Sequence, residues 1–196
     1  TSSTSPVSRN SFIGPIVLGR GQGFQPYGGY PFPMSLARHS DTIVAPITAI
    51  GGAVAVVRAS GPQAWEVASA VFAPWPTSVV THRSLYGTFS HGDDGLALPF
   101  DEGRSYTGEQ SVELSVHGSR ASVSGLIEAC IEAGARIAKP GEFTLRAFMN
   151  GRIDLTQAEG VRDTVNAATD AQLRQANLLR DGVLRDQVRA IRSDVE

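Results

Sequence analysis

The chain has 196 residues, of which 41% are hydrophobic and 18% are charged, and its formal net charge is −2. This length and composition predict one or two globular domains. No apolar run reaches the ~18 residues that a membrane-spanning helix needs, and the net charge argues against nucleic-acid binding by bulk electrostatics. The one cysteine, Cys130, lies in an apolar run, so we expect a buried structural thiol and a reducing compartment.

Residues 1–40 differ from the remainder in composition. They contain no Asp or Glu, are rich in Ser, Gly and Pro, and show no helical or strand period, which predicts a disordered tail. We favour an artificial or upstream start, with Met34 as the natural beginning. The alternative is a targeting segment, because the tail carries Arg9, Arg20 and Arg38 and no acid.

From Asp41 onward, strand-like and helix-like segments alternate. Short apolar runs between turn residues predict strands, and Pro62 stands where a first helical turn tolerates proline. Gly134 is suited to end a helix. The predicted strands are 42–48, 53–60, 78–90, 96–100, 111–117 and 135–138, the predicted helices are 63–72 and 120–134, and 103–110 is a predicted loop. This order predicts an α+β fold, with one mixed domain over residues 41–155.

Further along, no strand pattern returns, and we expect an all-α segment over residues 156–196. The stretch "KPGEFTLRAFMNGRIDLTQAEGV" indicates a short helix, an Asn-Gly turn and a second helix, which either Asp154 or Thr156 can open. Two segments have the spacing of a capping box, which predicts that a helix begins at each: Thr156-x-x-Glu159 and Thr169-x-x-Gln172.

The last segment repeats apolar residues at helical spacing, at Leu184, Val188, Ile191 and Val195. The pattern stops without a helix stop signal, so we expect a truncated molecule or a fragment of a longer one. An amphipathic helix without a partner surface is marginal, and we expect this helix to be partly frayed.

Sequence motifs for common chemistries are missing from the 196 residues. They contain no G-x-x-x-x-G-K-[ST] loop, no G-x-S-x-G and no Cys or His pair at metal-ligand spacing. We therefore predict no catalytic residue and no metal site in this chain. Ordinary structural roles are expected for His39 in the tail, His82 on a strand surface and His91 in a turn. His117 and Glu113 lie ~13 Å apart along one predicted strand, too far for a catalytic pair.

Three charged residues have unusual positions. Arg58 ends an apolar strand, Glu113 lies on the polar face of a strand, and Arg152 follows the Asn-Gly turn. Each has an ordinary interpretation as a solvated charge, which for Arg58 means the edge of a sheet. Each also has a functional interpretation as a group that faces a ligand. The residues by themselves leave both interpretations open.

Four segments carry a resemblance to a known family. "DTIVAPIT", "AVAVVRASGP", "YTGEQSVELSVHG" and "KPGEFTLRAFMNGRIDLTQAEGVRD" occur in this order between residues 41 and 196. Together they resemble the N-terminal part of the tRNA-modification GTPases called MnmE or TrmE. The most specific piece is "PGEFTLRAFMNGRIDLTQAE".

The resemblance implies a fold and an activity. It implies a domain similar to the folate domain of the glycine-cleavage aminomethyltransferase, which binds a one-carbon tetrahydrofolate, as the 5-formyl or 5,10-methylene form, and which makes a homodimer. A helical domain follows, with an inserted GTPase domain that uses GTP and potassium. With a flavoprotein partner of the MnmG type, the family adds an aminomethyl-type group to carbon 5 of the tRNA wobble uridine. The implied compartment is the cytoplasm, or the mitochondrion if the tail is a targeting segment.

The resemblance also implies three folate-binding residues. The family's folate contacts fall on Arg58, Glu113 and Arg152. A carboxylate accepts two neighbouring N–H groups, so Glu113 would bind the amino group and ring N–H of the pterin. The two arginines would donate to a pterin carbonyl or to the glutamyl tail, in an order that stays open.

The chain departs from the family pattern at three places. Arg152 stands where the family commonly has Lys, which keeps the charge and changes the geometry. The loop Thr48–Gly52 is shorter than the family's and lacks its prolines, and Ser119 replaces a glycine. The GTPase domain is absent, so we expect this chain alone to be inactive in GTP hydrolysis and tRNA modification.

Two other functions compete with a folate-binding fragment of this family. One is a stand-alone folate-dependent aminomethyltransferase, which the helical segment argues against. The other is a dimerisation module with a degenerate pocket, which the short loop Thr48–Gly52 supports. A folate-binding assay and the coding sequence downstream of residue 196 would separate the three.

Overall fold

The computed structural model of the protein describes residues 41–182. In this part of the chain, seven strands form one mixed sheet in the order β3-β4-β5-β6-β2-β1-β7. All neighbouring strands are antiparallel except β1 and β7, which are parallel. The strands are β1 (Ile43–Pro46), β2 (Val54–Ser60), β3 (Phe72–Ala73), β4 (Leu85–Phe89), β5 (Asp94–Phe100), β6 (Ser111–His117) and β7 (Arg136–Ile137).

The described residues also form five helices, which agrees with the α+β fold expected from the sequence. They are α1 (Ala64–Val71), α2 (Arg120–Glu132), α3 (Glu142–Met149), α4 (Leu155–Asn166) and α5 (Asp170–Arg180). No strand follows β7 in this part of the chain, as the change of period predicted. None of the helices between residues 41 and 182 is both long and apolar enough to cross a membrane.

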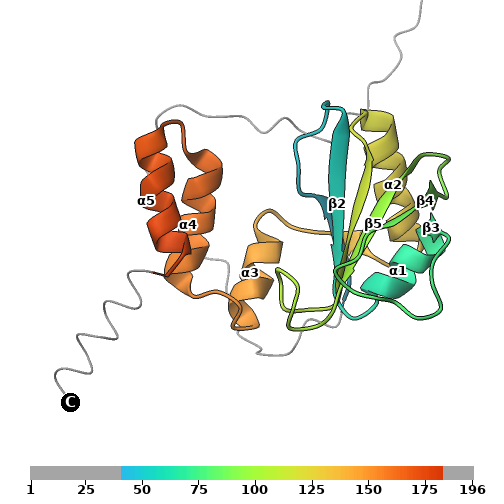
Figure 1. The fold of residues 1–196 in the computed structure, drawn as a ribbon, viewed down its shortest axis with the longest axis horizontal. Coiled ribbons are helices and arrows are strands. Elements are labelled where there is room, and N and C mark those ends of the chain that lie inside the picture. Colours follow the sequence, from blue (N-terminus) through green and yellow to red (C-terminus); the bar gives the residue numbers. More distant parts are fainter. Residues whose placement is uncertain (1–40, 183–196) are drawn as a thin grey trace, which may run out of the picture. The chain divides into compact units, whose positions relative to one another are not determined.

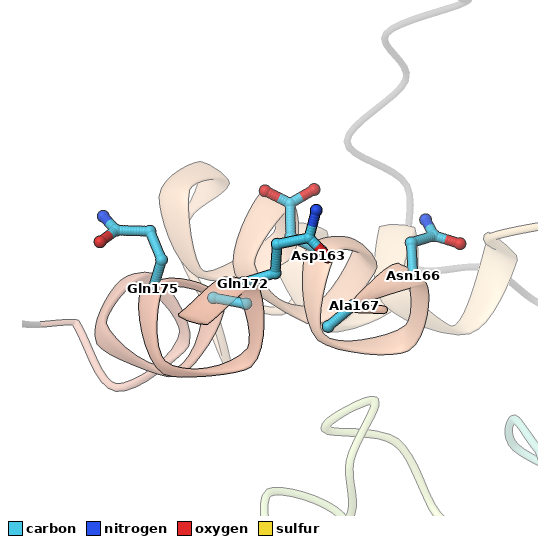
Figure 2. A pocket seen from close by; sticks show the side chains of 6 residues that line it. Asp163, Asn166, Ala167, Gln172 and Gln175 are labelled. Carbon is cyan, nitrogen blue, oxygen red and sulfur yellow. The ribbon is translucent and has the colours of Figure 1, made fainter. Parts of the chain in front are cut away.

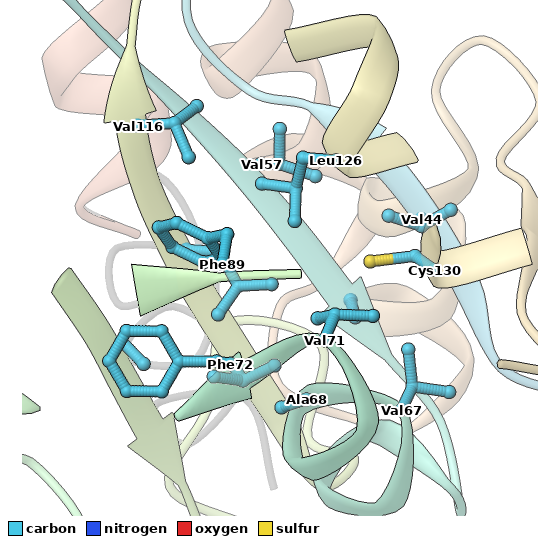
Figure 3. Close-up of a cluster of buried hydrophobic side chains, with 14 of the residues drawn as sticks. Val44, Val57, Val67, Ala68, Val71, Phe72, Phe89, Val116, Leu126 and Cys130 are labelled. Atoms are coloured by element: carbon cyan, nitrogen blue, oxygen red, sulfur yellow. The ribbon is translucent and has the colours of Figure 1, made fainter. Parts of the chain in front are cut away.

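The hydrophobic core lies between the sheet and helices α1 and α2, which cover the same face (Figure 1). Alternate residues of β2 and β6 point into it, including Val57 and Leu114, each fully buried. Leu126 and Cys130 of α2 meet them there (Figure 3). Burial of each large aliphatic side chain contributes about 1.5–3 kcal/mol, so this face holds the domain together. Burial also raises the pKa of Cys130 to about 12, which fits the structural thiol predicted.

Two sequence predictions about local structure are wrong. The strand predicted over 78–90 extends only over Leu85–Phe89, because His82 adopts a left-handed backbone conformation, with φ of 59°, in a turn. For the same reason His82 does not lie on a strand surface. The capping box predicted at Thr156 is instead formed by Asp154 and Gln157, so Thr156 lies inside α4.

The second predicted capping box is confirmed. Thr169 accepts from the backbone N–H of Gln172, and the side chain of Gln172 accepts in return, at the start of α5. Helices α4 and α5 pack closely at Gly160, where an added Cβ would lie 2.5 Å from the backbone nitrogen of Arg180. The helix predicted over residues 184–195 lies outside the described residues.

Candidate ligand-binding site

An ion pair stands on the sheet face that α1 and α2 leave uncovered. Arg58 of β2 lies directly opposite Glu113 of β6 in the strand register. The Nη2 and Nε atoms of Arg58 donate to the same oxygen, Oε1 of Glu113, at 2.6 and 3.2 Å. The side chains are 14% and 25% exposed. The interpretation of Arg58 as a charge at the sheet edge is wrong, because β2 lies between β1 and β6.

The neighbours of this ion pair in the sheet are apolar. Ala45 lies opposite Arg58 on β1, and Leu98 lies opposite Glu113 on β5. Because directly opposed residues of antiparallel strands share a face, these four side chains form one row across the sheet. A charged pair flanked by apolar side chains is a common arrangement in ligand pockets, where polar groups set orientation and apolar walls supply contact area.

Two aromatic rings hold the guanidinium of Arg58. Its carbon Cζ lies 4.9 Å from the ring centre of Tyr106 and 5.5 Å from that of Phe143. The hydroxyl of Tyr106 is hydrogen-bonded to Thr144 Oγ1 at 2.9 Å, which fixes the ring against α3. Cation–π contacts of this kind contribute about 0.5–2 kcal/mol. Sequence interpretation missed both rings, since they lie in the loop 101–110 and in α3.

Arg152 lies in the turn between α3 and α4, where it is bonded to the loop 101–110. It follows Gly151, whose φ of 69° is left-handed, and its Nε donates to the carbonyl of Ser105 at 3.1 Å. Beside it, Asn150 Nδ2 donates to the carbonyl of Thr107 at 2.8 Å. The Asn-Gly-Arg turn thus fastens the loop 101–110, and that same loop carries the ring that covers Arg58.

A close approach explains a glycine in this loop. Gly108 has a left-handed φ of 80°, and an added Cβ there would lie 2.8 Å from Cγ of Arg152. The loop and the turn therefore interlock through a residue without a side chain. Of the three predicted site residues, the structure pairs Arg58 with Glu113 directly, whereas Arg152, which is exposed, is bonded to the loop backbone.

A buried guanidinium joins α3 to the sheet and to the loop 101–110. Arg146 is 0% exposed. It donates to Asp41 Oδ1 at 2.8 Å, to Glu142 Oε1 at 3.1 Å and to both carboxylate oxygens of Glu109 at 3.2 Å. Glu109 in turn accepts from Ser60 of β2 at 2.8 Å. These contacts fix α3, and with it Phe143, over the end of the uncovered face.

Arg136 of β7 extends this network to the surface, with ion pairs of 2.6 Å to both Asp41 and Glu142. The side chains of Arg136 and Asp41 are 41% and 42% exposed. Burial by itself would raise the pKa of Glu142, but hydrogen bonds from Arg136, from the backbone of Lys139 and from Arg146 lower it to about 2. The carboxylate is therefore ionised at neutral pH. Sequence interpretation missed this network, and the one local signal for it was the i, i+4 spacing of Glu142 and Arg146 in α3.

A second polar cluster lies at the turn between β4 and β5. Asp93 accepts from the hydroxyl of Ser122 in α2 and is paired with His117 Nδ1 at 2.6 Å. Asp94 lies within 4.8 Å of the same histidine and carboxylate atoms. Its side chain accepts from the hydroxyl of Tyr86. These partners account for the cluster as a tie between the turn, β6 and the first turn of α2.

A hollow of about 300 Å³ lies between α4 and α5. Figure 2 shows side chains that line it, among them the amides of Asn166, Gln172 and Gln175 and the carboxylate of Asp163. The amide oxygen of Gln172 already accepts from the backbone of Ala168 and Thr169, so it serves the helix start. The lining residues are Asp163, Asn166, Ala167, Gln172, Gln175 and Ala176. Compared with this hollow, the Arg58–Glu113 ion pair is the better candidate for a ligand site, because it combines charged groups with apolar neighbours.

Comparison with known proteins identifies the family. Residues 42–152 match the family model described as "GTP-binding protein TrmE N-terminus". The chain belongs to this family. The TrmE match contains all three predicted site residues and the network around Arg146 except Asp41, which precedes it, whereas α4 and α5 follow it.

Curated relatives of the TrmE family match a larger share of this chain than the family model does. The tRNA modification GTPase MnmE of Caulobacter vibrioides is 51% identical over 139 residues, which are 70% of this chain and 31% of that protein. The MnmE of Synechococcus sp. (strain JA-3-3Ab) is 42% identical over 166 residues, 80% of this chain and 36% of that protein. The MnmE of Nitratidesulfovibrio vulgaris (strain DP4) is 39% identical over 167 residues, 81% and 36% of the two chains. The chain thus spans about a third of the length of the curated relatives it matches.

Proposed function

We propose that the described domain binds a one-carbon tetrahydrofolate, as the 5-formyl or 5,10-methylene form, on the uncovered face of the sheet. The observation that carries the proposal is the Arg58–Glu113 pair, partly exposed between apolar neighbours and under two aromatic rings. A pterin is a flat ring with a polar edge, so it needs both an apolar surface and paired donors and acceptors. Arg152, in the turn after α3, is bonded to the loop that carries Tyr106, and we assign it to the anionic glutamyl tail.

We also propose that this face makes a homodimer. Several apolar residues on or beside this face are exposed, and apolar side chains that gather on one face often mark an interaction surface. The exposed residues on or beside the face are Ile47 (38%), Ile50 (38%), Val54 (60%) and Leu96 (42%). In a dimer of this kind, the folate site would lie beside the interface.

For the whole protein, we propose the activity that the relatives' name states, tRNA modification coupled to GTP hydrolysis. The reaction would add an aminomethyl-type group to carbon 5 of the wobble uridine, with an MnmG-type flavoprotein as partner, in the cytoplasm. The 196 residues contain no P-loop, so GTP and potassium would bind elsewhere in the protein and this chain alone would be inactive. A stand-alone aminomethyltransferase is disfavoured, because relatives that match 70% and 80% of this chain are named as GTPases.

Calorimetric titration of the chain with 5-formyltetrahydrofolate tests the folate proposal. We expect binding to the wild-type chain, loss of binding in Glu113→Ala, and unchanged binding in Glu128→Ala, which removes an exposed carboxylate of α2. Absence of binding to a folded wild-type chain would overturn the proposal.

A dimerisation module with a degenerate pocket is the second candidate. The observation in its favour is that Arg58 and Glu113 neutralise each other, which gives both a structural role without a ligand. Sedimentation at several concentrations, run beside the titration, separates the candidates: a dimer that binds no folate supports the second one.

A further inference from the structure

The turn between α3 and α4 contains the only Asn-Gly pair of the 196 residues, Asn150-Gly151. Asn-Gly is the dipeptide most prone to deamidation, because glycine has no side chain to shield its backbone nitrogen from the asparagine amide. Asn166 and Asn177 precede Ala and Leu, whose side chains hinder the same attack. Asn150 is exposed, so water reaches it.

We propose that Asn150 is a site of spontaneous deamidation in the folded protein, and that the contact of its side chain with the loop 101–110 limits the rate. In this reaction the backbone nitrogen of Gly151 bonds to Cγ of Asn150, and the Cγ–Nδ2 bond breaks. Nδ2 leaves as ammonia with the proton that the Gly151 nitrogen loses. Water then opens the cyclic imide at either carbonyl, which leaves aspartate or isoaspartate. The sum is one water consumed and one ammonia released.

The folded conformation holds the reacting groups apart. Asn150 has a ψ of 6°, which aligns the nitrogen of Gly151 with that of Asn150 and turns it away from Cβ. The N–H of Gly151 donates to the carbonyl of Phe148 at 3.0 Å. Nδ2 of Asn150 donates to the carbonyl of Thr107 at 2.8 Å. The attack therefore needs a local opening of the turn and its release from the loop, and the free energy of this opening sets the rate.

The product cannot restore the contact with the loop 101–110. Deamidation replaces the donor Nδ2 by a carboxylate oxygen, so two acceptors face each other at the carbonyl of Thr107. Isoaspartate also adds a carbon to the main chain between α3 and α4. The fit is close at this point, because a Cβ built on Gly108 lies 3.1 Å from Cβ of Asn150. Deamidation is thus an irreversible loosening of the loop.

Mass spectrometry of the whole chain, incubated at alkaline pH and then digested with trypsin, tests the proposal without any ligand. Trypsin cuts after Arg146 and Arg152 and isolates Asn150 in the peptide "AFMNGR". We expect this peptide, and not those of Asn166 and Asn177, to gain the mass of an amide-to-carboxyl exchange. The gain should be at least about tenfold slower in the folded chain than in urea. Equal rates in the two, or no product in the folded chain after many half-lives of the unfolded reaction, would overturn the proposal.

Two glycine variants test whether the loop limits the rate. Gly108→Ala crowds Asn150 and Arg152, and should speed the deamidation of Asn150 several-fold. Gly103→Ala, where an added Cβ meets nothing within 4 Å, should leave the rate unchanged. Equal rates in the two variants would overturn the role of the loop.

Asn150→Asp imitates the aspartate product and tests its effect. Proteolysis of a folded chain follows its local opening, so trypsin cleavage after Arg104 measures how often the loop 101–110 opens. We expect this cleavage to be several-fold faster in Asn150→Asp than in the wild type. Asn166→Asp adds the same charge at the end of α4 and should keep the wild-type rate. Equal cleavage in the two variants would show that the amide of Asn150 does not fasten the loop.

Discussion

On the helix-covered face of the sheet, β2 and β6 bury Val57 and Leu114 against α2, and the contacts are apolar throughout. On the opposite face, the same two strands present Arg58 and Glu113, and α3 is held there by the fully buried Arg146. The first face is stabilised by the removal of apolar surface from water. The second is held by ion pairs, in which a buried charge that loses a partner is strongly destabilising.

The difference between the faces indicates where a ligand binds. The apolar face is closed by close packing of hydrophobic side chains. The polar face keeps a partly exposed ion pair beside Phe143 of α3. Substitutions on the apolar face should therefore lower stability alone, whereas substitutions on the polar face can also weaken ligand binding.

Arg146→Met should cause the largest loss, because it leaves Asp41, Glu109 and Glu142 without their shared cation. Removal of one partner from a buried ion network costs about 3–5 kcal/mol, measured here as the change in free energy of unfolding in urea. The control is Arg162→Met, since Arg162 is 62% exposed in its pair with Asp163 and should contribute at most about 1 kcal/mol. Similar losses in the two variants would mean that the buried network is not a main support of the polar face.

Leu126→Ala should destabilise the apolar face by about 2–5 kcal/mol, through lost burial and a residual cavity. Ile131→Ala in the same helix is the matched control, because Ile131 is 39% exposed and should cost under about 1 kcal/mol. At urea concentrations where Leu126→Ala remains folded, its affinity for 5-formyltetrahydrofolate should equal that of the wild type. A weaker affinity there would show that the two faces are not independent.

Gly108→Ala should loosen the loop that carries Tyr106. Both Gly108 and Gly103 have left-handed φ values, of 80° and 77°, but an added Cβ meets Arg152 only at Gly108 and nothing within 4 Å at Gly103. An alanine forced into the left-handed backbone conformation costs about 1–3 kcal/mol. Gly103→Ala therefore measures this backbone cost alone. We expect a greater loss of stability, and weaker folate binding, in Gly108→Ala than in Gly103→Ala, and equal effects would contradict the interlock of loop and turn.

The smallest effect concerns pH and the tie between His117 and Asp93. The hydrogen bond and charge of Asp93 raise the pKa of His117 above its ordinary value of 6.5. A raised pKa in the folded state means that the ion pair stabilises fully below pH 6.5 and that this stabilisation is lost as pH rises through the folded value. Melting temperatures between pH 5.5 and 8.5 should therefore fall more for the wild type than for His117→Asn. His82→Asn, at a left-handed position that asparagine tolerates, should keep the wild-type slope.

Much of the local structure could be predicted because it depends on local patterns. The alternation in "SVELSVH" predicted β6 and its two faces, and Thr169 with Gln172 predicted the start of α5. Prediction failed where a single residue overrode the pattern. His82 ended the extended conformation before β4, and Asp154, a better N-cap in context, displaced the cap expected at Thr156. The domain boundaries and the folate-contacting roles stay predictions.

The sequence by itself determined the family, the α+β order of elements and the three unusual charges. Only the tertiary structure decided that Arg58 and Glu113, 55 residues apart, are partners, that Arg146 is buried, and that Arg152 bonds to the backbone of Ser105. The physical reason is that periodicity shows which face of an element a residue occupies. Partners across the sheet are set by strand order and register, which depend on the packing of the whole domain.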